Sequence, residues 1–397
     1  MNKPCETSDP DRCPKDNNRD ENAILDEHGF WDYTTPCAGG MEMYQKEDYI
    51  SLLDDMEAAG MNSLSFSVKW MTTGYKSSLP FMDQLPDNPI IESDNELLRF
   101  AIDECKKRKI KIWLMAVVNF FDVALYGGEP NNIMDMTGGR PIPFRYGVYD
   151  SDDSMVVERT VQIFEELVTL FPNVDGLVFE TETDNVESPR RIPLYNAWAK
   201  ENGRVEFDQV GRPHDPRFAD VADWRDYTTH ARLCMMEAVE KAVRARGFEG
   251  DLSTICAPYM KKYALLQEMN LAEVHRRCPN WTVIAYWYDK YKSRDAMMEW
   301  CVNRPREDGN KVIYLPRGVM TWEETAQWPL PVSLETHWEM DVEDIVRYKP
   351  DSVWWFGCGS VNDGIHVDTS LLKQSGYKDG AEARRALLSK VKCLKTR

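Results

Sequence analysis

The feature that most constrains the fold is a regular alternation of helical segments with short apolar segments typical of buried strands. The helix expected at 44–60 ends at Gly60, a common C-terminal cap, and the strand expected at 63–70 follows directly. This order recurs along the chain. The expected strands are 29–33, 63–70, 110–118, 176–180, 252–257, 282–287, 311–315 and 352–356. The expected helices are 44–60, 95–108, 155–171, 227–246, 263–277, 294–303, 342–348 and 380–391.

Strands separated by helices pair in parallel, with each helix crossing over the sheet. Eight such units predict a fold of the α/β class, a single (β/α)8 or TIM barrel with long loops on its C-terminal face. Such a barrel takes about 250 residues and can exceed 400 with insertions, so 28–397 suffices after a polar N-terminal arm at 1–27. The alternative is an open doubly wound sheet, but no Gly-rich phosphate-binding loop follows an early strand.

The position of one strand stays open. The segment PVSLET at 331–336 has a strand-like composition and would serve as the seventh strand if GFWDY at 29–33 were a plug outside the ring. The long insertions at 72–94, 122–153 and 183–226 each follow a strand directly. Loops after strands form the active-site face of a barrel, so these insertions predict a deep substrate cleft.

The charge of the chain limits its partners. A formal net charge of −18 argues against nucleic acid and anionic membrane, which both require a basic surface. There is no apolar run of the roughly 18 residues needed to span a membrane, and the first residues lack the apolar core of a signal peptide. We therefore expect a cytoplasmic protein if the chain is complete, and a periplasmic or secreted one if a signal was removed. The sequence does not decide the oligomeric state.

The cysteines and histidines give no sign of a metal centre or cofactor. The ten cysteines include no C-x-x-C pair, and the six histidines show no paired ligand spacing. Apolar segments carry the four cysteines that we expect as buried free thiols, Cys105, Cys234, Cys256 and Cys301. The polar N-terminal region carries the candidates for a disulfide, Cys5, Cys13 and Cys37.

The fourth strand ends in VFETETD, which places Glu180 and Glu182 on one face. Two neighbouring carboxylates raise the pKa of one of them, so that one is protonated while the other is ionised. Cleavage of a glycosidic bond needs this division between an acid and a carboxylate. We expect Glu182, nearer the end of the strand, to be the acid and Glu180 to set its pKa. The alternative is a structural ion pair with a buried Arg or Lys.

A second acidic cluster lies in SLETHWEMD. If PVSLET is a strand, Glu335 stands at its C-terminal end and is the candidate nucleophile or base. The separation of the two carboxyl groups then decides the stereochemistry, about 5–5.5 Å for retention and about 6.5–9.5 Å for inversion. We expect Glu339 and Asp341 to form the first turn of the helix at 342–348 instead, where the helix dipole favours acidic residues.

Aromatic and polar residues gather at the ends of the expected strands. Sugar rings stack on aromatic side chains, and polar side chains hold their hydroxyl groups, so a carbohydrate substrate is expected. Each aromatic residue taken alone is more often part of a core. The candidate substrate-binding residues are Lys69, Trp70, Asn119, Tyr259, Tyr286, Trp287, Asp289, Arg317, His337 and Trp355.

Three segments resemble glycoside hydrolase barrels. DYISLLDDMEAAGMNSLSFSVKW is similar to their helix and second strand, FPNVDGLVFETE to their fourth strand with its catalytic acid, and VWWFGCG to their eighth strand. The resemblance implies a hydrolase that acts on an oligo- or polysaccharide. Thr181 stands before Glu182, where the large retaining clan has Asn and hexosaminidases have Asp, so no single family is assigned.

Two other functions fit the same residues. The first is a metal-dependent sugar isomerase or lyase, which would hold a divalent ion at Glu180, Glu182 and Asp289. The second is a barrel that binds glycans without cleaving them.

Overall fold

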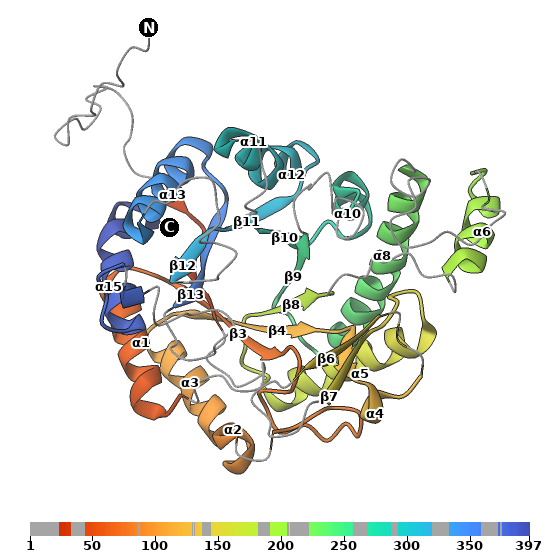
Figure 1. The fold of residues 1–397 in the computed structure, drawn as a ribbon, viewed down its shortest axis with the longest axis horizontal. Coiled ribbons are helices and arrows are strands. Elements are labelled where there is room, and N and C mark those ends of the chain that lie inside the picture. Colours follow the sequence, from red (N-terminus) through yellow and green to blue (C-terminus); the bar gives the residue numbers. More distant parts are fainter. Residues whose placement is uncertain are drawn as a thin grey trace, which may run out of the picture.

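The structure is a computed structural model that describes residues 24–32, 44–85, 88–128, 130, 132–136, 144–181, 191–204, 206, 222–256, 269–286, 293–319, 333–358, 372–373 and 375–397. Its central sheet is a ring of parallel strands surrounded by helices (Figure 1). The eight main strands are β2 (Glu27–Asp32), β3 (Ser63–Lys69), β4 (Lys111–Val117), β8 (Gly176–Glu180), β9 (Asp251–Cys256), β10 (Trp281–Tyr286), β11 (Lys311–Leu315) and β13 (Ser352–Cys358). The ring closes because β13 pairs with both β2 and β11. The predicted (β/α)8 barrel is confirmed, and an open sheet is excluded.

The seventh strand is the segment around Pro316, not PVSLET. The short strand β12 (Arg317–Val319) continues β11 beyond Pro316 and pairs with β13 in the same register. In PVSLET, Ser333 caps helix α13 (Leu334–Tyr348) by accepting a hydrogen bond from the Thr336 amide at 3.2 Å. The alternative seventh strand is therefore wrong, and residues 29–32 of the first expected strand enter the ring as part of β2.

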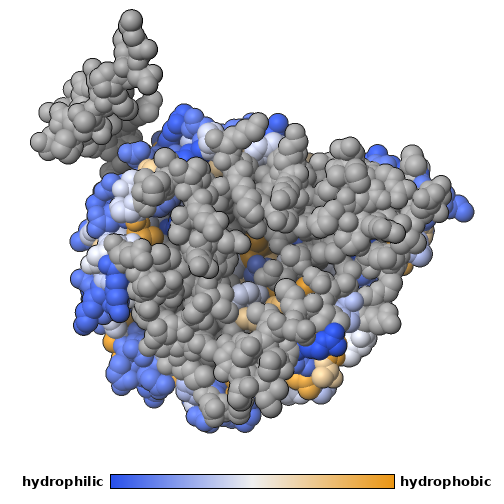
Figure 2. Space-filling view, viewed as in Figure 1, coloured by the Kyte–Doolittle hydropathy of each residue, from blue (hydrophilic) through white to orange (hydrophobic). Residues whose placement is uncertain are grey.

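The helices of the outer layer lie between successive strands (Figure 1). They are α1 (Lys46–Ala58), α3 (Glu96–Lys107), α5 (Ser154–Leu170), α8 (Ala222–Ala245), α10 (Leu271–Arg277), α11 (Arg294–Met298), a π-helical segment (Glu299–Asn303), α12 (Arg304–Glu307), α13 and α15 (Gly380–Lys390). The outward surface over α1, α13 and α15, at the left of the view, is hydrophilic (Figure 2). Their inward faces pack on the strands in one apolar cluster.

The starts of two helices, α13 and α10, need comment against their expected bounds. α13 begins at Leu334 rather than 342, because Leu334, Trp338 and Ile345 form a buried stripe at helical spacing. Asp341 lies on the same buried stripe, and this polar residue hides the apolar pattern in the sequence. Within the described residues α10 begins at Leu271, after Asn270, whose side chain accepts a hydrogen bond from the Glu273 amide at 3.3 Å. This polar cap begins α10 at Leu271, and residues 263–268 of the expected helix lie outside the described residues.

The barrel interior is filled by a second apolar cluster. Trp31, Trp113 and Trp354 belong to it. The ring centroids of Trp113 and Trp354 lie 5.1 Å apart. At the end where the strands begin, the carboxylate of Glu27 accepts hydrogen bonds from the Trp113 indole at 2.9 Å and the Ser63 hydroxyl at 2.7 Å. This polar network lies at the N-terminal end of an interior that is a packed core and not a pore.

The expected insertions carry their own structure. The insertion after β3 contains α2 (Pro89–Glu92), and that after β4 contains a three-stranded antiparallel sheet with α4 (Val123–Tyr126). The strands of this sheet are β5 (Phe120–Asp122), β7 (Phe144–Val148) and β6 (Asn132–Met136). The insertion after β8 contains α6 (Arg191–Glu201), which packs on the outer side of α8, at the right of Figure 1.

The two ends of the described chain meet. β1 (Ile24–Leu25) pairs in parallel with β14 (Lys395–Thr396), which follows a 3-10 turn (Val391–Cys393) after α15. Residues 24–27, expected in the polar arm, thus already lie in or between strands. Within the described part of the chain, no helix has the length and apolar character needed to cross a membrane.

Candidate active site

Glu180 ends β8 and points to the barrel interior. Val178, two residues before it on the same face, belongs to the interior cluster, and the Glu180 side chain is half-buried. The Glu180 carbonyl accepts a hydrogen bond from the Val118 amide at 2.9 Å, which extends the pairing of β4 with β8. The carboxylate therefore lies at the C-terminal end of the barrel interior, which is the end where barrels carry their active sites.

A buried cation lies beside this strand end. Arg232 of α8 is 2% exposed and donates a hydrogen bond to the hydroxyl of Thr181, which is also buried. Glu182, the expected acid, lies outside the described residues. Arg232 was not predicted from the sequence, although its helical spacing from Thr228, Met235 and Met236 places it on the buried face of α8.

Aromatic side chains stand at the same end of the barrel. Trp70 directly follows β3, is partly exposed and packs against the interior cluster, to which Phe120 and Tyr146 belong. The rings of Phe120 and Tyr146 lie 5.0 Å apart, and the Tyr146 hydroxyl donates a hydrogen bond to Asp83 at 2.9 Å. We call these aromatic residues together with Glu180 the mouth of the barrel. Trp70 lies where the sequence placed it, whereas Tyr146 and Asp83 were not predicted.

Lys69, a candidate substrate-binding residue, does not face the barrel interior. The pairing of β3 with β4 shifts between Ser67, opposite Met115, and Lys69, opposite Ala116. Such a bulge re-aims the next side chain. The Lys69 ammonium, 1% exposed, donates hydrogen bonds to the carbonyls of Trp70 and Phe120 and lies 4.1 Å from the Phe121 ring centroid. Lys69 thus holds the main chain of Trp70 and Phe120, two residues of the mouth, in place.

Asn119 also has a supporting place. It is fully buried, its carbonyl accepts a hydrogen bond from the Tyr149 amide at 2.8 Å, and its side-chain amide donates to the Tyr149 carbonyl at 3.3 Å. Both bonds tie the end of β4 to the residue that follows β7. Asn119 therefore holds the inserted sheet over the barrel.

Trp355 lies in the outer apolar cluster, away from the mouth, so its predicted place at the mouth is wrong. Neighbouring residues of a strand point to opposite faces, and Trp354 occupies the interior position instead. The Trp355 indole donates a hydrogen bond to Nε2 of His28 at 3.0 Å. Since Nε2 accepts, the proton of the neutral His28 ring is on Nδ1.

The burial of His28 predicts a pH dependence of stability. Desolvation lowers the pKa of His28 to about 3, whereas an unfolded His titrates near 6.5. The unfolded chain therefore binds more protons between these values, and stability is full above pH 6.5 and falls as the pH drops towards 3. From pH 7 to pH 5 the loss from His28 should be about 2 kcal/mol.

We expect this loss in the difference between the native chain and His28→Gln, measured by urea unfolding at each pH. Gln keeps an acceptor for Trp355 and does not titrate. His275→Gln is the control, because His275 is exposed on α10. Parallel curves for His28→Gln and the native chain would contradict the prediction.

Arg317 of β12 and His337 of α13 are both buried and interact electrostatically. Arg317 is 5% exposed and pairs across the ladder with Phe356 of the interior cluster. His337 of α13 is buried, and its pKa is lowered to about 4 by burial, Arg317 and Arg294.

Asp341 lies in the middle of α13, not in its first turn as expected, and forms a buried ion pair with Arg294. Burial raises the pKa of Asp341 against the effect of Arg294.

Glu335 does not stand at a strand end. It is exposed in the first turn of α13 and accepts a hydrogen bond from the Tyr377 hydroxyl at 2.7 Å. The predicted position failed because PVSLET is not a strand. Glu339, expected in a first turn, lies in the middle of α13 and pairs with Lys390.

The remaining predicted residues are only partly described. The backbone of Tyr286 pairs with Leu315 at the end of β10. Tyr259, Trp287 and Asp289 lie outside the described residues, as do Cys5, Cys13 and Cys37. Cys105 and Cys301 are buried free thiols as predicted, whereas Cys234 is exposed. Among the side chains that the structure describes, no three His, Cys, Asp or Glu are grouped as metal ligands.

Comparison with known proteins supports the fold. No protein-family model matches the chain, and no curated protein matches it. Among solved structures it is similar to a GH138 enzyme targeting pectin rhamnogalacturonan II, with 13% identity over 95% of this chain and 40% of that one, and a TM-score of 0.50. A β-galactosidase from the psychrophilic Marinomonas ef1 shares 13% identity over 92% of this chain and 59% of its own, with a TM-score of 0.57.

A third structure is Gan42B, a GH42 β-galactosidase, with 12% identity over 93% of this chain and 57% of its own, and a TM-score of 0.54. This chain thus spans between 40% and 59% of the length of these three enzymes. The fold is therefore a TIM barrel that resembles the barrels of several glycoside hydrolases, as the sequence predicted.

Proposed function

We propose that this chain is a glycoside hydrolase that cleaves a glycosidic bond in an oligo- or polysaccharide by carboxylate acid/base chemistry. The observation that carries the proposal is the position of Glu180, half-buried at the inner C-terminal end of β8. A carboxylate in this position is costly to bury unless it has a partner or a chemical task. The fold neighbours, which are glycoside hydrolases, support the same reaction class.

The surroundings of Glu180 suit two carboxyl groups in different protonation states. Arg232 contacts Thr181, which separates Glu180 from Glu182 in the sequence. A buried guanidinium favours the ionised form of a nearby carboxylate, and an ionised carboxylate raises the pKa of its neighbour. We assign the role of acid to Glu182 and the role of its charged neighbour to Glu180.

The mouth also suits a carbohydrate substrate. Trp70 is partly exposed and packs against the apolar interior cluster. Asp83 and the Tyr146 hydroxyl add a polar pair next to the Phe120 ring. Sites of this composition combine apolar contact with a few oriented hydrogen bonds, which is how ligand pockets fix orientation.

A panel of aryl glycosides, oligosaccharides and polysaccharides tests the proposal. We expect release of the aryl group or of reducing sugar from at least one member, and no change in rate with excess chelator. Activity that chelation abolishes would indicate the metal-dependent isomerase or lyase instead. Binding measured by calorimetry without turnover on any member would indicate a glycan-binding barrel.

A further inference from the structure

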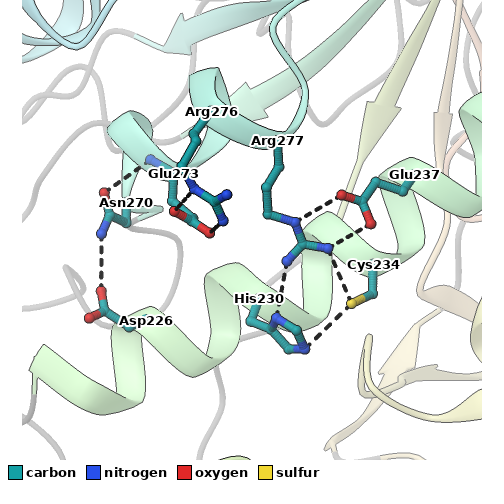
Figure 3. A network of polar contacts seen from close by, with 8 residues as sticks. All are labelled: Asp226, His230, Cys234, Glu237, Asn270, Glu273, Arg276 and Arg277. Carbon is teal, nitrogen blue, oxygen red and sulfur yellow. Dashed lines mark hydrogen bonds and ion pairs between the residues drawn. The ribbon is translucent and has the colours of Figure 1, made fainter. Parts of the chain in front are cut away.

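A cluster of charged and nucleophilic side chains lies on the outer layer, between α8 and α10. His230 and Cys234 stand one turn apart on α8, and the guanidinium of Arg277 reaches both from α10 (Figure 3). The Cys234 sulfur lies 3.5 Å from Nε2 of His230 and 3.5 Å from Nη2 of Arg277. Two donors from two helices thus converge on one exposed thiol.

Arg277 is held in place by a carboxylate. Its Nε and Nη2 donate to the two oxygens of Glu237 at 2.8 and 2.6 Å, a bidentate pair that fixes the plane of the guanidinium (Figure 3). The side chain of Arg277 is only 14% exposed, whereas that of Glu237 is 43% exposed. The cation is therefore presented to Cys234 in one orientation.

The tautomer of His230 follows from the same geometry. Nη1 of Arg277 lies 3.0 Å from Nδ1 of His230. A guanidinium has no acceptor, so it donates and Nδ1 accepts. The neutral ring must then carry its proton on Nε2, which faces the Cys234 sulfur. Both neighbours of the sulfur are thus donors, and a thiolate accepts these hydrogen bonds better than a thiol does.

The direction of its pKa shift distinguishes Cys234 from four other cysteines of the described residues. The hydrogen bond from His230 lowers the pKa of Cys234, against the effect of partial burial and with further help from Arg277. Burial raises the pKa of Cys105, Cys278, Cys301 and Cys393. Accessible thiols with a low pKa are the reactive ones, since the thiolate is the nucleophile.

We propose that Cys234 is a site of reversible thiol modification, where the thiolate exchanges with a low-mass anionic disulfide such as glutathione disulfide. The sulfur attacks one sulfur of the disulfide, and the new S–S bond forms as the old one breaks. The other half leaves as a thiolate and takes up a proton from water. Cys234 is oxidised by the same amount as the departing sulfur is reduced. Arg277, the cation that contacts the Cys234 sulfur, favours an anionic reagent.

The modified side chain would lie near the insertion after β8, which contains α6. The ring of His230 lies 6.4 Å from that of Trp198 on α6. A group attached to Cys234 would meet His230 first and α6 next. The proposal itself does not rest on the proposed function, because it concerns the chemistry of the thiol alone.

The test measures the rate of modification of each cysteine in the full native chain. The chain is treated with iodoacetamide from pH 6 to 9, and separately with glutathione disulfide, and the modified peptides are quantified by mass spectrometry. At pH 7 we expect Cys234 to react at least about tenfold faster than Cys393 and than an unfolded peptide that spans Cys234. Glutathione disulfide should label Cys234 first, and a reducing agent should remove the label.

Matched variants test whether His230 and Arg277, and not solvent exposure alone, make Cys234 reactive. His230→Phe and Arg277→Gln should each slow the reaction of Cys234 about fivefold or more at pH 7. Arg276→Gln is the control, because Arg276 pairs with Glu273 and not with the thiol. A native Cys234 rate equal to that of the unfolded peptide, rising tenfold per pH unit up to pH 8, would overturn the proposal even if a variant fails to fold. Unchanged rates in folded His230→Phe and Arg277→Gln would overturn it equally.

Discussion

Replacement of Glu182 by Gln is expected to lower kcat/KM on a natural glycoside by roughly 10²- to 10⁴-fold, the usual contribution of a general acid. The amide has nearly the shape of the acid but has no proton to transfer to the leaving oxygen. The measurement is steady-state hydrolysis of the best substrate from the panel. The far-ultraviolet circular dichroism and the melting temperature should match those of the native chain.

The leaving group distinguishes an acid from a residue that only binds substrate. An aryl glycoside whose phenol is a strong acid needs little protonation, so Glu182→Gln should cleave it at close to the native rate. Glu180→Gln should instead shift the basic limb of the pH profile, because Glu180 is assigned as the charge that raises the pKa of its neighbour. Glu339→Gln, on the outer face of α13, is the matched control. Native activity of Glu182→Gln on all substrates would refute the assignment.

The largest loss of stability is expected at Arg191, which is fully buried at the start of α6. Its Nε donates to Asp152 at 2.8 Å, and its guanidinium lies 5.4 Å from the Trp224 ring centroid and 5.5 Å from that of Tyr227. Tyr227 donates a hydrogen bond to the same carboxylate. Arg191→Met leaves this carboxylate buried without its cation, which should cost about 3–5 kcal/mol in the free energy of unfolding.

Urea unfolding measures this loss, and a second variant tests its cause. Arg191→Met combined with Asp152→Asn should recover a large part of it, because the uncompensated charge is then removed. Arg204→Met is the control, since Arg204 pairs with Asp223 in the same region but is 47% exposed, and such pairs are worth about 1 kcal/mol or less. If Arg191→Met and Arg204→Met lose equal stability, burial of the ion pair is not what stabilises α6.

The sequence predicted the barrel because each strand and helix carries its own periodic pattern. The end of β8 was predicted at Glu180, and the inward direction of Glu180 followed from Val178. These inferences need only the two-residue period of a strand, so they hold wherever the strand is regular.

The same rule failed where pairing with another segment decides the outcome. The bulge after Ser67 turns Lys69 away from the interior, and nothing in SLSFSVKW itself requires a bulge. In VWWFGCG the sequence pattern alone does not say which tryptophan faces the interior. The register with β2 places Trp355 opposite Phe30 of the outer apolar cluster, where its indole also reaches His28. The buried cations Arg191 and Arg232 went unnoticed because their acidic or hydroxyl partners lie on other elements.

The parallel pairing of β1 with β14 has a topological consequence. Ile24 stands opposite Lys395 and Leu25 opposite Thr396, and the Arg397 amide donates to the Leu25 carbonyl at 3.0 Å. These segments lie at the end of the barrel where the strands begin, the side away from Glu180. The part of the chain from Ile24 to Arg397 is therefore nearly a closed loop, and a short peptide that joins these two residues would allow this part to be cut in an outer connection instead. A fusion partner or a solid support attached at Arg397 would face away from the mouth.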